Sequence, residues 1–218
     1  MVPMANVRSE LGPLHLQWQP TLVDALDETA TFDASFAGAM RVALDETAWV
    51  EHVPGWVRGA EALFEDVVAH APWEHRTVRM YDRMVDEPRL TAWYGRALVD
   101  AEHPAIFTEM IAALRARYDR VFDSVGAALY RDGRDSVAWH GDRVDPTLVE
   151  PVVAIVSLGS ARTLRMRARW RRGETRPFHL FPGDLFVMGG TTQSSWEHAV
   201  PKVARAGARV SVQFRHSS

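Results

Sequence analysis

The sequence predicts an α+β fold in which short strands form a barrel or jelly roll and helices nearer the N-terminus cover one side of it. Apolar residues make up 47% of the 218 residues, which is enough for one large core. Two helical patterns precede residue 123. After Ser124 the sequence changes to short β-rich runs that Gly, Pro and Asp separate, as is typical of barrels and jelly rolls.

The first 55 residues carry several Pro and Gly and show no sustained periodicity. We therefore expect an N-terminal extension of loops and short helices over residues 1–55, and one folded domain over residues 56–218. No internal repeat or low-complexity stretch divides the chain further.

Two segments show the spacing of an amphipathic helix. Apolar residues recur three and four positions apart between Gly59 and Ala71, and Pro72 ends the segment. A second segment starts at Pro104, a favourable first helical residue, and runs to about Phe122. We expect each helix to pack one face against a sheet.

Seven later runs have the composition of strands. They are residues 126–130, 136–140, 151–159, 163–170, 176–182, 184–190 and 208–215.

The composition limits the possible chemistry. The chain has no cysteine, so disulfides and thiolate ligands are excluded and histidine and carboxylate remain as metal ligands. With a net charge of −3, nucleic acid could be held only by a local basic patch. The chain shows no signal peptide and no apolar stretch of membrane-spanning length, and we expect a cytoplasmic, monomeric protein without membrane attachment.

Residues 135–142, DSVAWHGD, end with a histidine and an aspartate two positions apart. In an extended chain these side chains share a face, so His140 and Asp142 would lie side by side as two ligands of a metal. Such a pair also arises often by chance. His198, within WEHAVP, is a third candidate ligand, although a single histidine there is more often packed or at the surface.

Residues 209–215, RVSVQFR, alternate polar and apolar side chains. Arg209, Ser211, Gln213 and Arg215 share one face. Two arginines that point into a barrel need an anion, unless the strand is an exposed edge or nearby carboxylates pair with them. Two imidazoles and one carboxylate can hold non-haem Fe(II), and an arginine can bind the far end of a keto acid that chelates the metal.

These features together resemble the AlkB-like 2-oxoglutarate and Fe(II)-dependent dioxygenases. The resemblance extends from Trp56 to His216 and includes EPRLTAWYG, LYRDGRDSVAWHGD, VVAIVSLG, PGDLFVMGG, WEHAVPK and RVSVQFR. It implies a double-stranded β-helix, or jelly roll, with Fe(II) as cofactor and 2-oxoglutarate as co-substrate. It also implies oxidative demethylation of alkylated bases in DNA or RNA, with release of succinate, CO₂ and formaldehyde. The base would be in a single strand or flipped from a duplex.

The resemblance also implies roles for individual residues. His140, Asp142 and His198 would be the catalytic metal ligands. Tyr130 and Arg209 would hold the far carboxylate of 2-oxoglutarate, with Arg215 near its metal-chelating end.

Three positions depart from the family pattern. Ala128 and Ser211 stand near the co-substrate where the family usually has asparagine, and Ser211 retains a hydroxyl that can form hydrogen bonds. Val144 stands where an acidic residue often follows the metal aspartate. These departures leave the co-substrate affinity and the base preference open.

Residues 76–96 resemble the nucleotide-recognition lid of the family. Met80, Tyr81, Trp93 and Tyr94 would contact the flipped base, although Trp93 and Tyr94 could also be core aromatics. Separately, the arginines at 165, 167, 169 and 171 alternate with Leu164, Met166, Ala168 and Trp170. Arg165, Arg167 and Arg169 are therefore candidates to contact phosphates, unless carboxylates on a neighbouring strand pair with them.

Two other functions fit the same residues. A 2-oxoglutarate oxygenase of this fold could act on a small molecule or on a protein side chain, because the iron site does not specify the substrate. A catalytically silent nucleic-acid-binding module could also retain the fold.

Overall fold

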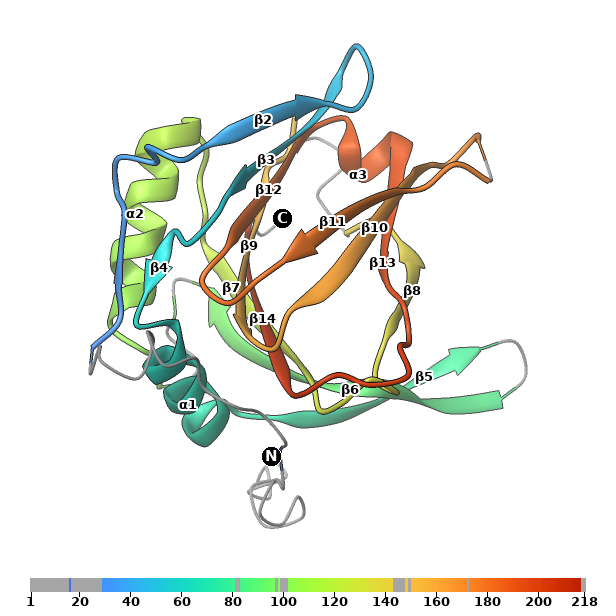
Figure 1. Cartoon of the computed structure of the whole chain (residues 1–218), viewed down its shortest axis with the longest axis horizontal. Helices are drawn as coiled ribbons and strands as arrows, with labels where there is room; N and C mark the ends of the chain where they lie inside the picture. The colour runs from blue at the N-terminus through green and yellow to red at the C-terminus, as the bar shows by residue number, and fades with distance from the viewer. Residues whose placement is uncertain are drawn as a thin grey trace, which may run out of the picture.

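The structure is a computed structural model that describes residues 16, 29–80, 83–96, 98, 102–142, 148, 150–171 and 173–216. Two antiparallel sheets enclose the centre of the molecule (Figure 1). The large sheet has the order β2 (Met40–Ala43), β3 (Ala48–Val53), β12 (Leu185–Gly190), β9 (Val153–Gly159), β14 (Arg209–Arg215), β7 (Ser124–Tyr130), β6 (Arg83–Arg96) and β5 (Glu74–Met80). The small sheet has the order β11 (Arg176–Leu180), β10 (Arg162–Ala168), β13 (Trp196–Val200) and β8 (Val137–His140). The predicted jelly roll is confirmed.

Two helices cover the outer face of the large sheet (Figure 1). They are α1 (Ala60–His70) and α2 (Ile106–Tyr118), which lie within the two segments predicted to be helical. Phe64 of α1 and Phe107 of α2 are buried and share one core cluster with Phe214 of β14. The helices therefore buttress one sheet, as the spacing of their apolar residues predicted. Within the described residues, no helix has both the length and the apolar character needed to cross a membrane.

A second core fills part of the space between the two sheets. Along β12, Leu185 and Val187 face the helices, whereas Phe186 and Met188 face the small sheet. The strand is buried on both faces, which explains why its sequence is apolar throughout instead of alternating. Met166 of β10 packs into the same inner core from the opposite sheet.

The seven predicted runs each contain or overlap a strand, but the N-terminal expectation was wrong for the described part of the extension. Residues 29–55 contain strands where short helices were expected: β1 (Thr31–Phe32), which pairs with β4 (Val57–Arg58), then β2 and β3. β3 pairs with β12 over its whole length, so the large sheet extends into the expected extension. β3 and β12 pair as two largely buried strands of the core. The periodicity within residues 48–53 does not show which strand becomes the neighbour.

A buried carboxylate joins β3 to α2. Glu51 accepts hydrogen bonds from Tyr118 Oη at 2.7 Å and from Arg41 Nε at 3.0 Å, and Arg117 lies 3.3 Å away. Burial alone would raise the pKa of Glu51, but these partners hold it below the ordinary value of 4.5. The charged form therefore stabilises the contact between sheet and helix.

We predict that Glu51→Gln lowers the free energy of unfolding by about 1–2 kcal/mol at neutral pH. Because the folded-state pKa is lowered, this stabilisation is present above the unfolded-state pKa and is lost as the pH falls through the folded-state pKa. The difference from the parent protein should therefore shrink in acid. Urea unfolding at neutral and acidic pH measures it, with the exposed Glu46→Gln as control. An equal effect at both pH values would contradict the prediction.

Candidate active site

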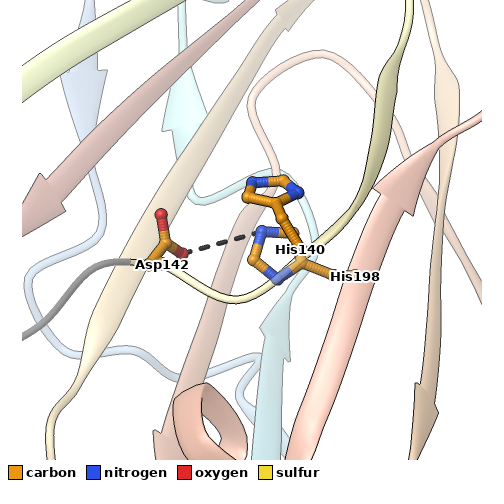
Figure 2. Close-up of side chains that lie close together, drawn as sticks. All are labelled: His140, Asp142 and His198. Atoms are coloured by element: carbon orange, nitrogen blue, oxygen red, sulfur yellow. Dashed lines mark ion pairs between the residues drawn. The ribbon is translucent and has the colours of Figure 1, made fainter. Parts of the chain in front are cut away.

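Three predicted metal ligands meet at one end of the small sheet. His198 on β13 lies directly opposite His140 on β8, and their ring centroids are 4.3 Å apart. Asp142 follows β8, and one ligand atom from each of the three residues lies within 4.8 Å of the others. Figure 2 shows the Asp142 carboxylate facing a ring nitrogen of His198, with His140 beside it. The structure therefore brings the three together.

Asp142 reaches this position by contacts that differ from those expected. β8 ends at His140, so simple strand alternation does not extend to Asp142. Instead, the Asp142 N–H donates to Gln193 Oε1 at 2.8 Å. A Cβ on Gly141 would lie 2.7 Å from the Gln193 carbonyl oxygen, so the close approach requires glycine at this position. Gln193 belongs to α3 (Thr192–Ser195), 51 residues along the chain from Asp142.

The protonation states suit a metal. His140 Nδ1 lies 2.8 Å from the Ala138 carbonyl oxygen and must donate to it, so that in the neutral ring Nε2 is the nitrogen with a lone pair for a metal. Burial lowers the pKa of His198 to about 4, so this ring is neutral at neutral pH. Although burial opposes it, the Arg215 guanidinium holds the pKa of Asp142 below its usual range.

The Asp142 carboxylate also has one unused oxygen. Oδ1 accepts from Arg215 Nη2 at 2.7 Å, whereas Oδ2 is buried without a hydrogen bond and lies 3.6 Å from His198 Nε2. A buried carboxylate oxygen without a donor is costly, and a cation removes the cost. Two neutral imidazoles and this oxygen fit the ligand set of non-haem Fe(II).

A buried arginine lies at the other end of the cavity. Arg209 is 1% exposed, and its Nε donates to Ser157 Oγ at 3.0 Å. Its Nη1 has no hydrogen-bond partner, and no described carboxylate forms a salt bridge with it. Burial lowers the pKa of Arg209 to about 10, so the guanidinium stays charged at neutral pH. The group fits the carboxylate of an acidic co-substrate.

Tyr130 lies beside this arginine, with its ring centroid 5.3 Å from the Arg209 guanidinium carbon. A second arginine, Arg162, lies 5.6 Å from the same ring. The Arg162 guanidinium donates to the backbone carbonyls of Asp132, Asp135 and Pro201. Arg162 therefore supports Tyr130 while its own donors are directed at the backbone, and the sequence analysis did not find this role.

A cavity of about 160 Å³ connects the two ends of the site. Arg209, Tyr130, Ser211 and the metal ligands line its interior, and Trp93 and Glu74 line it as well. Ser211 is paired with Ala128, and both residues line the cavity.

Of the four predicted base contacts, the structure favours one. Trp93 lines the cavity and is 48% exposed. Tyr94 is fully buried against Phe107 under the helices, so its prediction as a base contact does not fit the structure. Adjacent residues of a strand point to opposite faces, so Trp93 and Tyr94 could not both face the base. The Met80 side chain, Tyr81 and Val144 lie outside the described residues.

Two of the four alternating arginines at 165, 167, 169 and 171 have partners within the protein. Arg167 donates to Glu197 at 2.8 Å, from the neighbouring strand β13, and Arg169 donates to the Gln193 carbonyl at 3.1 Å. Carboxylate pairing, the alternative to phosphate, accounts for Arg167. Arg165 is exposed. Trp170 does not continue the apolar face, because β10 ends at Ala168 and Trp170 is 83% exposed.

Comparison with known proteins agrees with this site. Residues 50–215 match the family model of the 2OG-Fe(II) oxygenase superfamily, and the chain belongs to this superfamily. Over 183 residues it is 33% identical to alpha-ketoglutarate-dependent dioxygenase alkB homolog 3 of Homo sapiens, covering 74% of this chain and 64% of the relative. Over 190 residues it is 26% identical to DNA oxidative demethylase ALKBH2 of Arabidopsis thaliana, covering 70% and 60%. The chain thus spans less than two thirds of either relative.

A solved structure, that of OsALKBH1, covers 82% of this chain and is wholly covered by it, with a TM-score of 0.57 and 13% identity. This likeness supports the fold. The family match and the sequence relatives place the chain among the AlkB-like oxygenases, a branch of dioxygenases that use Fe(II) and 2-oxoglutarate.

Different residues of the site would hold the metal and the co-substrate of such an enzyme. Bound Fe(II) supplies the redox chemistry with O₂. His140, Asp142 and His198 would hold it, and the Ala138 carbonyl and Gln193 fix two of these ligands in place. We propose that Arg209 and Tyr130 orient the far carboxylate of 2-oxoglutarate and that Arg215 lies near its other end. Arg215 also keeps Asp142 deprotonated.

We predict that His198→Ala abolishes specific divalent-metal binding, because it removes one of three ligands. Titration calorimetry with Mn(II), a redox-stable substitute for Fe(II), measures binding, and circular dichroism checks that the fold survives. The control is His179→Ala, an exposed histidine in the same small sheet. Full metal affinity in His198→Ala would show that the third ligand is misassigned.

We predict that Arg209→Lys weakens 2-oxoglutarate binding by about tenfold or more, because a lysine cannot replace a bidentate guanidinium. Ala128→Asn should strengthen binding by adding a donor next to Ser211. Titration of the Mn(II)-loaded protein with 2-oxoglutarate compares both with the exposed control Arg205→Lys. An unchanged affinity in Arg209→Lys would exclude Arg209 as the carboxylate ligand.

Proposed function

We propose that this protein oxidatively demethylates alkylated bases in DNA or RNA, using Fe(II), O₂ and 2-oxoglutarate and releasing succinate, CO₂ and formaldehyde. The observation that carries the proposal is a single cavity lined both by the buried ligand cluster and by Trp93, whose half-exposed aromatic ring can stack on a base. The names of the relatives, which include a DNA oxidative demethylase, support the same substrate class.

The burial of the site favours a base that leaves the helix stack. Asp142 and His198 are less than 10% exposed, so an alkyl group on a base paired in a duplex could not reach them. A flipped base or a single strand meets this requirement. The hairpin of β5 and β6 forms the outer edge of the large sheet next to the cavity (Figure 1). We propose that it is the lid over the nucleotide.

Contacts to the backbone of the nucleic acid would be few. Of the arginines predicted to meet phosphates, Arg165 is exposed, whereas Arg167 and Arg169 would have to exchange partners that they already have. We therefore assign phosphate contact to Arg165 first. A cytoplasmic location and a monomeric state are part of the same proposal.

The test is formaldehyde and succinate release from methylated oligonucleotides, with His198→Ala as the inactive control. We expect both products in equal amounts, and only with methylated substrate. Succinate release that methylated oligonucleotides do not stimulate would favour an oxygenase of small molecules or proteins. Oligonucleotide binding without any turnover would favour a silent binding module.

A further inference from the structure

One row of residues crosses the cavity face of the large sheet. Gln213 on β14 pairs with Gly126 on β7, and Gly126 pairs with Trp93 on β6. All three line the cavity. Because the three residues are in register on neighbouring strands, they form one row across the sheet. The row has the Gln213 amide at one end, the Trp93 ring at the other and no side chain at Gly126 between them.

The missing side chain leaves a slot. A Cβ at Gly126 would lie 3.5 Å from the Trp93 ring and 3.6 Å from Gln213 Oε1. The tryptophan edge and the amide oxygen therefore border the same small space above the sheet. A flat ring that contacts Trp93 there would have its edge within reach of Gln213.

The hydrogen bonds of Gln213 decide which end of its amide is available. Nε2 lies 2.7 Å from the Ser211 carbonyl oxygen and 3.0 Å from Ser211 Oγ. A backbone carbonyl can only accept, so the group that faces it must be the NH₂ and the amide cannot be flipped. Oε1 consequently points away from Ser211, and no group among the described residues donates a hydrogen bond to it. The cavity therefore presents a fixed acceptor.

We propose that Gln213 determines base specificity by accepting a hydrogen bond at Oε1 from an exocyclic amine beside the alkylated ring nitrogen. This inference rests on the proposed function. Alkylation at that ring nitrogen places a positive charge on cytosine or adenine, which makes the amine a stronger donor. A base with a carbonyl in that place would face Oε1 with a second acceptor, and the two oxygens would repel.

Another acceptor in the cavity is a competing candidate. Glu74 also lines the cavity, but it is exposed, where water competes for its carboxylate. Gln213 is partly buried, and both of its donor hydrogens have acceptors in Ser211. A fixed acceptor discriminates between bases better than a mobile, solvated one, since a wrong base cannot push it aside without breaking those bonds.

The test uses two oligonucleotides of one sequence that carry either 3-methylcytosine or 3-methyluracil. Both have a pyrimidine ring with the methyl group at the same nitrogen, and they differ in the amine or carbonyl at position 4 of the ring. The measured quantity is the ratio of kcat/KM for the two substrates. Gln213→Leu should lower the preference for 3-methylcytosine by about tenfold, because it removes the acceptor at nearly constant volume.

The control variant is Glu74→Gln, which changes the other acceptor that lines the cavity, leaves the Gln213 amide in place and should retain the preference. The 2-oxoglutarate affinity and the melting temperature of each variant show whether a change comes from Ser211 or from the fold. An unchanged ratio in Gln213→Leu would overturn the inference, as would a preference that is lost in Glu74→Gln instead. If the parent protein is active and Gln213→Leu has the same kcat/KM ratio, this inference alone is overturned. Inactivity of the parent protein on every methylated oligonucleotide would overturn the proposed function as well.

Discussion

The two faces of β14 connect the core of this protein to its chemistry. Val210, Val212 and Phe214 are fully buried against the helices, while the residues between them face the cavity. Hydrogen bonding to β7 on one side and β9 on the other fixes this arrangement along the whole strand. A shift of one residue would place arginines among the apolar side chains of the helices, which would be very costly, so the register that builds the core also positions Arg209 and Arg215.

Much of this could be predicted from the sequence because the signals are local. The two helices follow from apolar spacing within about a dozen residues, and the inward face of β14 follows from alternation within seven. The ligand set followed from the order of His140, Asp142 and His198 and from the absence of cysteine. Each of these arguments needs only residue type and spacing, together with the resemblance to a known family.

The remaining features depend on which strands become neighbours, and spacing does not reveal this. Alternation indicates that Trp93 and Tyr94 face opposite sides, but only the pairing of β6 with β7 shows which of them reaches the cavity. Gln193 holds the backbone of Asp142 from a short helix that has no local link to the metal motif. The partner of Arg167 is likewise set by the pairing of β10 with β13. Contacts between segments that are distant in the sequence therefore decided these features of the site.

The metal-ligand cluster and the residues proposed to hold the co-substrate belong to different halves of the jelly roll. His140 and His198 lie on the small sheet, with Asp142 just beyond it, whereas Arg209 and Tyr130 lie on the large sheet. The apolar inner core holds the sheets together elsewhere, while Arg215 reaches Asp142 across the gap at the site. A dicarboxylate that chelates the metal and contacts Arg209 would act as a tie between the sheets. Its binding free energy would then add to the free energy needed to separate the two sheets. A higher occupancy of the site would therefore make the scaffold more rigid.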